Sequence, residues 1–259
     1  GCSSLETVIF ADGNVIDTIT SWMFGNCYSL KNITLPDTVT TIESSAFQMC
    51  RSLETINIPA WCASIDFRAA FYGCYSLTSI NIDPENETFV VEDGIVMNKA
   101  KTEILACLPQ KTGSYTIPEN VTIADGAFQN TNLDEIVLPT SLKKIPNYWF
   151  SGISADTQIT IPEGVETIGE YAFAYGEMTT INIPASVSSI GKYAFQNCKN
   201  LQTVNIAGGN VRLAIGSNAF ENCEALDNVV IPARVRLTAT ASSGNFAVGA
   251  YAFKRCYSL

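Results

Sequence analysis

One phrase of amino acids recurs along the whole chain, and this repetition limits the fold more than any other feature. It is clearest at residues 53–59 and 178–184, where an alternating apolar segment ends at a proline. The copies follow one another at intervals of about 23 residues, inside the window of roughly 20–29 that marks leucine-rich repeats. About ten copies fit into the 259 residues. The period predicts a chain that winds in coils, with one strand and one compact return in each coil.

Within each copy, apolar and polar residues alternate as in a half-buried strand. Ile56 and Ile58 are expected to point inward, and Thr55 and Asn57 outward. Proline fixes φ and lacks the backbone donor that a strand ladder needs, so it ends the pairing at the same corner of each coil. These corner prolines are Pro36, Pro59, Pro118, Pro139, Pro162, Pro184 and Pro232.

A single coil of this kind is too small to fold alone, because ordering its backbone costs more free energy than its few apolar side chains recover. Stability must therefore come from stacking against neighbouring coils. We expect a β-rich solenoid, a right-handed stack of about ten coils that forms a single domain over residues 1–259. Both chain ends fall at the same phase of the repeat, Leu5 and Leu259, so we expect a fragment of a longer protein.

An apolar pair and then Ala-Phe follow each proline, as in Val165, Ile168 and Ala172-Phe173. The resulting pattern, Leu-x-x-Ile-x-Ile-Pro-x-x-Val-x-x-Ile-Gly-x-x-Ala-Phe-x-x-Cys, resembles the BspA-like leucine-rich repeat of bacterial surface proteins. Nine coils keep the phenylalanine: Phe24, Phe47, Phe71, Phe128, Phe150, Phe173, Phe195, Phe220 and Phe253. The resemblance implies a secreted or surface-anchored interaction module, and it does not imply a particular ligand.

Two coils are longer than the others. Residues 84–111 contain two apolar runs around Asp93-Gly94, a strong hairpin turn signal, so we expect a β-hairpin or three-stranded flap that leaves the solenoid. It would either contact a ligand or only stiffen the fold. Residues 236–246 are rich in Ala, Thr, Ser and Gly, and we expect a loop there.

Six of the nine cysteines share one slot, three residues after the repeat phenylalanine: Cys27, Cys50, Cys74, Cys198, Cys223 and Cys256. Other coils fill this slot with Thr131, Ile153 or Gly176, so it favours a small or apolar side chain. Parallel Cβ vectors on stacked coils would hold the Cβ atoms about 4.8 Å apart, farther than a disulfide prefers. We therefore predict a buried ladder of reduced thiols.

Two sets of residues are candidates for contact with a partner. The first is the outward row of hydroxyl and amide side chains on the strands: Thr34, Asn57, Asn81, Thr160, Asn182 and Asn205. Solenoids commonly bind partners on such a face, although the row could also be only a solvated surface. The second is a tyrosine stack two residues before the repeat phenylalanine: Tyr148, Tyr171 and Tyr193. Stacked rings also stabilise one another without any ligand.

Composition excludes several classes of function. The chain has no histidine, which removes imidazole-based catalysis and the commonest metal ligand, and no Cys-x-x-Cys pair offers a zinc site. The net charge of −10 repels nucleic acid. No apolar run is long enough to cross a bilayer, so we expect no direct membrane insertion. We predict no cofactor, no metal site and no catalytic residue.

The leading hypothesis is therefore a non-catalytic binding or adhesion module, extracellular or at the cell surface, for a protein or glycan partner that could come from a host. This hypothesis depends largely on analogy of fold. A glycan-acting enzyme that uses two carboxylates is one alternative, and it needs an acidic pair in a cleft. An intracellular leucine-rich repeat scaffold is another, since reduced cysteines fit that compartment as well.

Overall fold

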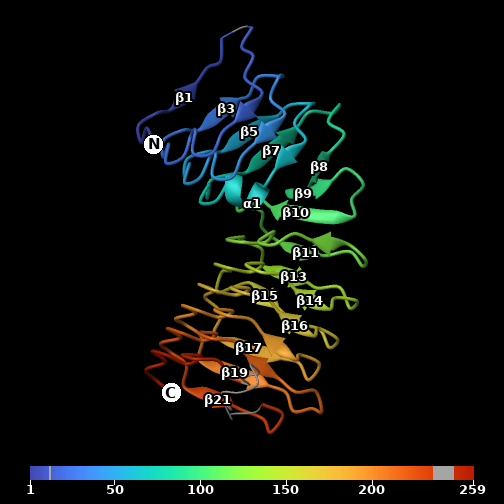
Figure 1. Ribbon diagram of the computed structural model, residues 1–259, viewed down its shortest axis with the longest axis vertical. Coiled ribbons are helices and arrows are strands. Elements are labelled where there is room, and N and C mark those ends of the chain that lie inside the picture. The colour runs from blue at the N-terminus through green and yellow to red at the C-terminus, as the bar shows by residue number, and fades with distance from the viewer. Residues whose placement is uncertain (12, 236–247) are drawn as a thin grey trace, which may run out of the picture. The chain divides into compact units, whose positions relative to one another are not determined.

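A computed structural model describes residues 1–11, 13–235 and 248–259. Contacts divide the chain into two compact units, residues 1–111 with 121–127, and residues 112–120 with 128–259. Each unit is a β-solenoid with little helix (Figure 1). The prediction of a single domain over residues 1–259 stays a prediction. The loop predicted at residues 236–246 lies outside the described residues.

The first unit contains two parallel sheets, each built from one strand per coil. The first sheet has the order β1-β3-β5-β7, with β1 at Thr7–Val8, β3 at Asn32–Thr34, β5 at Thr55–Ile58 and β7 at Ser79–Ile82. The second has the order β2-β4-β6, with β2 at Thr18–Ile19, β4 at Thr41–Ile42 and β6 at Ser64–Ile65. Equivalent residues pair across coils, so Ile33 lies opposite Ile56 and Ile56 opposite Ile80.

The second unit repeats this arrangement in three parallel sheets. One contains β11 at Ser114–Thr116, β13 at Glu135–Val137 and β15 at Gln158–Ile159. Another contains β17 at Thr180–Ile183, β19 at Thr203–Ile206 and β21 at Asn228–Val230. The third contains the short strands β14 at Lys144–Ile145, β16 at Thr167–Ile168, β18 at Ser189–Ile190 and β20 at Ala214–Ile215.

The short second strand was not predicted, because we expected one strand and a compact return in each coil. It forms where the second residue of the apolar pair reaches the core, as at Ile42, Ile168 and Ile190, all buried. The preceding Thr or Ser pairs with its equivalent in the next coil, as Thr167 does with Ser189. A segment of two residues is too short for its alternation to predict a strand.

The long insertion forms the predicted hairpin. Strand β8 at Phe89–Glu92 pairs antiparallel with β9 at Ile95–Asn98, and both turn residues have positive φ, 46° at Asp93 and 74° at Gly94. Strand β9 also pairs antiparallel with β10 at Glu103–Cys107, which pairs parallel with β12 at Thr122–Ile123. These four strands form a mixed sheet.

The hairpin differs from the expected flap in its packing. Ile95, Val96 and Met97 are all buried, so β9 is covered on both of its faces. Phe89 lies edge-on against Phe67 of the short helix α1 at Phe67–Ala70, with ring centroids 5.1 Å apart. Successive side chains of a strand point to opposite faces, so three consecutive buried residues mean that neither face of β9 is open to water. The insertion therefore forms part of the core of the first unit.

The repeat phenylalanines form the centre of each unit. In the second unit the rings of Phe173, Phe195 and Phe220 are nearly parallel, with centroids 5.1 and 5.0 Å apart. In the first unit Phe24, Phe47 and Phe71 stack at 5.3 and 5.5 Å. Within each unit the repeat phenylalanines therefore form a column of rings, in which each ring packs against the rings of the neighbouring coils.

Candidate functional site

Five of the six residues of the outward row lie on the first strand of their coils, and all six side chains are exposed. In the first unit Thr34 pairs with Asn57, and Asn57 with Asn81. In the second unit Asn182 pairs with Asn205, while Thr160 follows directly after the end of β15. Parallel register therefore places equivalent hydroxyl and amide groups side by side on one face of each unit.

The amide groups of this row bond to one another. Asn81 Nδ2 donates to Asn57 Oδ1 at 2.8 Å, and Asn205 Nδ2 donates to Asn182 Oδ1 at 2.9 Å. An amide has two donor hydrogens and an oxygen with two lone pairs, so each keeps some capacity for an outside partner. The bonds hold the side chains in one orientation, which reduces the entropy lost when a partner binds.

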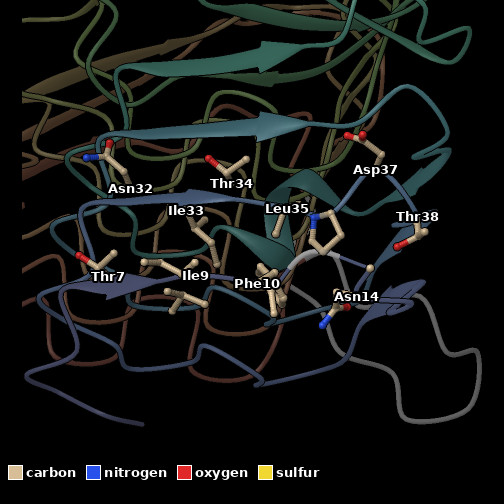
Figure 2. A pocket seen from close by; sticks show the side chains of 14 residues that line it. Thr7, Ile9, Phe10, Asn14, Asn32, Ile33, Thr34, Leu35, Asp37 and Thr38 are labelled. Atoms are coloured by element: carbon tan, nitrogen blue, oxygen red, sulfur yellow. The ribbon is translucent and has the colours of Figure 1, made fainter.

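An open groove of about 620 Å³ lies along β1 and β3 at the edge of the first unit. Figure 2 shows Thr34 of the outward row among its lining residues, together with Ile9 and Phe10 from the preceding coil. Ile9 occupies the slot that holds Thr34 and Asn57 in the next two coils, so an apolar side chain stands where the repeat places polar ones. It is 87% exposed. This groove was not predicted from the sequence, where the only sign of it is an isoleucine in a slot that is otherwise polar.

The three tyrosines stack as predicted. The ring centroids of Tyr148 and Tyr171 are 4.9 Å apart, and those of Tyr171 and Tyr193 are 4.7 Å apart, in nearly parallel planes. The side chains are half-buried, and burial together with the neighbouring phenols raises the pKa of Tyr171. They lie on the turn before the phenylalanine, not on the strand that carries the asparagine row.

Each of these tyrosines has a left-handed backbone, with φ of 57°, 54° and 58°. The conformation recurs two residues before and two residues after the repeat phenylalanine in most coils, as at Asn218 and Asn222. Asparagine and glycine adopt it at low cost, and a bulky residue does so only when its surroundings hold it there. The backbone N–H of each tyrosine donates to a carbonyl oxygen of the next coil, as Tyr171 N does to Lys192 O at 3.1 Å, and these bonds hold the conformation.

All nine cysteines are free thiols, and five of the six slot cysteines are buried as predicted, whereas Cys256 in the last coil is only half-buried. Five slot thiols each donate to the carbonyl oxygen of the repeat phenylalanine one coil back, namely those of Cys50, Cys74, Cys198, Cys223 and Cys256. Cys198 Sγ lies 3.1 Å from Phe173 O, and Cys223 Sγ lies 3.1 Å from Phe195 O. Burial raises the pKa of Cys62 to about 11 and that of Cys107 to about 12, so these thiols are poor nucleophiles at neutral pH.

Thiol reactivity tests this arrangement. In native protein at pH 8 we expect Cys2, which is exposed, to react first with a disulfide reagent, and the half-buried Cys256 to react more slowly. The other cysteines should react only after unfolding, because they are buried. Intact mass should be the same with and without reductant. A gain of about two daltons on reduction would show a disulfide and contradict the thiol ladder.

Among the described residues two carboxyl groups have shifted pKa values, and neither shift is the one that a general acid needs. A general acid needs a raised pKa, whereas the two shifted carboxyl groups in the described part of the chain, Glu119 and Glu221, both have lowered ones. Hydrogen bonds from Ser141 and Thr140 lower the pKa of Glu119 to about 2. Among the described residues, no group of three or more Cys, Asp or Glu side chains is placed to hold a metal ion.

The Glu119 interaction has a testable pH dependence. Its carboxylate accepts from the backbone and side chain of Thr140 and Ser141 on the next corner. Because its pKa is lower in the folded state, this interaction stabilises the fold above pH 4.5 and is lost as the pH falls from 4.5 toward 2. The difference in unfolding free energy between wild type and Ser141→Ala should therefore shrink over this range. A difference that stays constant would contradict the assignment.

No helix in the described part of the chain has the length and apolar character needed to cross a membrane. The model of the BspA type leucine-rich repeat region matches residues 1–93 and 121–259 in six copies. A search of curated proteins finds no match.

Several solved structures have a similar fold. A leucine-rich cell surface protein of Faecalibacterium prausnitzii is 29% identical with a TM-score of 0.64, over 80% of this chain and 61% of that protein. This chain thus spans about three fifths of that relative. The pneumococcal vaccine antigen PcpA is 22% identical with a TM-score of 0.67, over 95% of this chain and 73% of the antigen. A leucine-rich repeat protein of Eubacterium ventriosum is 20% identical with a TM-score of 0.51, over 93% and 80% of the two chains.

Proposed function

Because the chain belongs to the BspA-type leucine-rich repeat family, we propose that it is a non-catalytic binding module of a bacterial cell surface. A leucine-rich cell surface protein is among the similar structures, and that resemblance supports an extracellular location. The proposed partner is a protein or a glycan, and proteins or glycans of a host organism are among the candidates. The net charge of −10 argues against nucleic acid.

The observation that carries this proposal is the outward row of exposed amide and hydroxyl side chains. Strand pairing in register repeats the same donors and acceptors along each unit, and the bonds between Asn57 and Asn81 and between Asn182 and Asn205 orient them. A preorganised, repeated polar surface suits an extended partner, because each coil adds an equivalent contact. Catalysis would instead need a group with a matched pKa in a cleft.

The test is binding of the purified chain to a panel of immobilised host matrix proteins and glycans. Two variants remove the asparagine ladders, by which we mean the two bonded asparagine pairs of the outward row. One variant combines Asn57→Ala with Asn81→Ala, and the other combines Asn182→Ala with Asn205→Ala. A control variant removes the exposed ion pair of Lys143 and Glu166, which lies on neither ladder. We expect at least one panel member to bind and at least one ladder variant to weaken that binding about tenfold, with the control unchanged.

Two outcomes would contradict the proposal: binding that survives in both ladder variants, or cleavage of a panel glycan. The hairpin needs a separate variant, because its deletion would remove Phe89 and Val96 from the core. Glu92→Ala with Lys101→Ala removes an exposed ion pair of the hairpin and leaves the packed residues in place. Loss of binding in this variant alone would assign the contact to the hairpin.

A further inference from the structure

A tryptophan stands on the surface of the first unit at a position where the repeat places small or polar residues. Trp61 is the second residue after the corner proline Pro59, and its side chain is 75% exposed. The equivalent residues in the other coils with a corner proline are Thr38, Asn120, Ser141, Gly164, Ser186 and Arg234. An indole this exposed contributes little to folding, so its role must be sought outside the core.

Trp61 lines a cleft of about 690 Å³. One wall is the corner itself, with Ala60 and Ala63, and the other is the start of the insertion at residues 84–88. Lys99 from the end of the hairpin completes the lining. The insertion that this coil carries therefore supplies the second wall of the cleft.

The two walls are fastened together by a buried amide. Asn86 is 1% exposed, and its Nδ2 donates to Pro59 O at 2.9 Å and to Cys62 O at 2.8 Å, on either side of Trp61. Its Oδ1 accepts from the backbone N–H groups of Thr88 and Phe89. The loop is thus held against the tryptophan corner before any ligand arrives, and little entropy is lost on binding.

The charges of the cleft favour a cation. Glu85 and Glu87 are exposed on the insertion wall, and neither forms an ion pair with another described residue. The Lys99 ammonium keeps its positive charge while its Nζ donates to Asn86 O at 2.6 Å, so Glu85, Glu87 and Lys99 together give the lining a net charge of −1. An aromatic face attracts a cation within about 6 Å, and carboxylates at its side add charge-assisted hydrogen bonds.

We propose that this cleft binds an arginine side chain of a partner protein, with the guanidinium on the indole of Trp61 and its donors toward Glu85 and Glu87. Arginine fits better than lysine because its planar group stacks on a ring and forms paired bonds to a carboxylate. The chain already contains one such contact, in which the guanidinium carbon of Arg51 lies 5.3 Å from the Tyr28 ring centroid. This site is separate from the asparagine row and does not depend on the function proposed for it.

The test is a protein-observed NMR titration of the whole isotope-labelled chain with acetyl-Gly-Arg-Gly-amide. The same peptide with citrulline in place of arginine is the neutral control, and a set of monosaccharides is a third arm. We expect saturable binding of the arginine peptide that raised salt weakens, with about tenfold weaker binding of the citrulline peptide. The chemical shift of the Trp61 indole N–H should change, and that of the buried Trp149 should not.

Three variants complete the test. Trp61→Ala should abolish binding, and Glu85→Gln with Glu87→Gln should weaken it about tenfold while keeping the ring. Trp22→Phe alters another exposed tryptophan, which does not line the cleft, and should change nothing. Equal binding of the two peptides, no saturable binding by wild type, or a monosaccharide response that Trp61→Ala removes would each overturn the arginine assignment. The asparagine ladder variants should bind the peptide normally, so the two proposals can fail independently.

Discussion

Replacement of Phe195 by alanine is expected to lower the free energy of unfolding by about 4 kcal/mol, a typical cost for removing a buried aromatic ring. The side chain is fully buried, and rings lie on both sides of it at 5.1 and 5.0 Å. The loss therefore combines the transfer of the ring, the cavity that remains and two stacking contacts. Denaturant unfolding followed by circular dichroism measures it.

The matched control is Phe253→Ala, in the same slot of the last coil. Phe253 is only half-buried, and its described stacking contact is with Phe220 on one side. We expect a loss of about 1–2 kcal/mol, in proportion to the smaller buried area. Equal losses for the two variants would show that stacking between coils does not govern stability.

The second large effect is expected from Gly191→Ala. A Cβ atom at Gly191 would lie 2.7 Å from backbone atoms of Gly169 and Glu170, in the coil before it. The same close approach recurs at Gly216, whose Cβ would lie 2.6 Å from the carbonyl carbon of Gly191. Backbone cannot move aside as a flexible side chain does, so the coils must separate. We expect a loss of about 2–3 kcal/mol in the free energy of unfolding.

Gly208→Ala is the control for this substitution. A Cβ there would meet no heavy atom within 4 Å, and the backbone is not in the left-handed region. We expect its stability to remain within about 0.5 kcal/mol of wild type. If Gly191→Ala were equally harmless, the contact between the backbones of successive coils would not be as tight as the structure shows.

The repeat pattern predicted the features that depend on which residue occupies a slot. The period predicted the solenoid, and the alternation around Ile56 predicted which residues face inward and outward. The Asp93-Gly94 pair predicted the hairpin turn. The shared slot of Cys198 and Cys223 predicted reduced, buried thiols. These predictions succeeded because each concerns a local preference that every coil repeats.

Features that depend on contact between coils were beyond the same reasoning. The hydrogen bond from the Cys198 thiol to Phe173 O and the close approach at Gly191 depend on how the backbones of two coils fit side by side. The sequence of a single repeat does not determine that fit. The cleft at Trp61 requires that the insertion fold back onto the preceding corner through Asn86. A large aromatic residue in a slot of small polar residues was the signal for this cleft in the sequence.

Coils within a unit are expected to be coupled through their nearest neighbours, and the strand register that couples them also aligns the outward asparagines. Double-mutant cycles with Phe→Leu at positions 173, 195 and 220 test it directly, since leucine removes the ring and keeps most of the volume. We predict a coupling of about 1 kcal/mol for the neighbours Phe173 and Phe195, and none within about 0.5 kcal/mol for Phe173 and Phe220. Equal coupling for the two pairs, or none for either, would contradict the stacked-coil account.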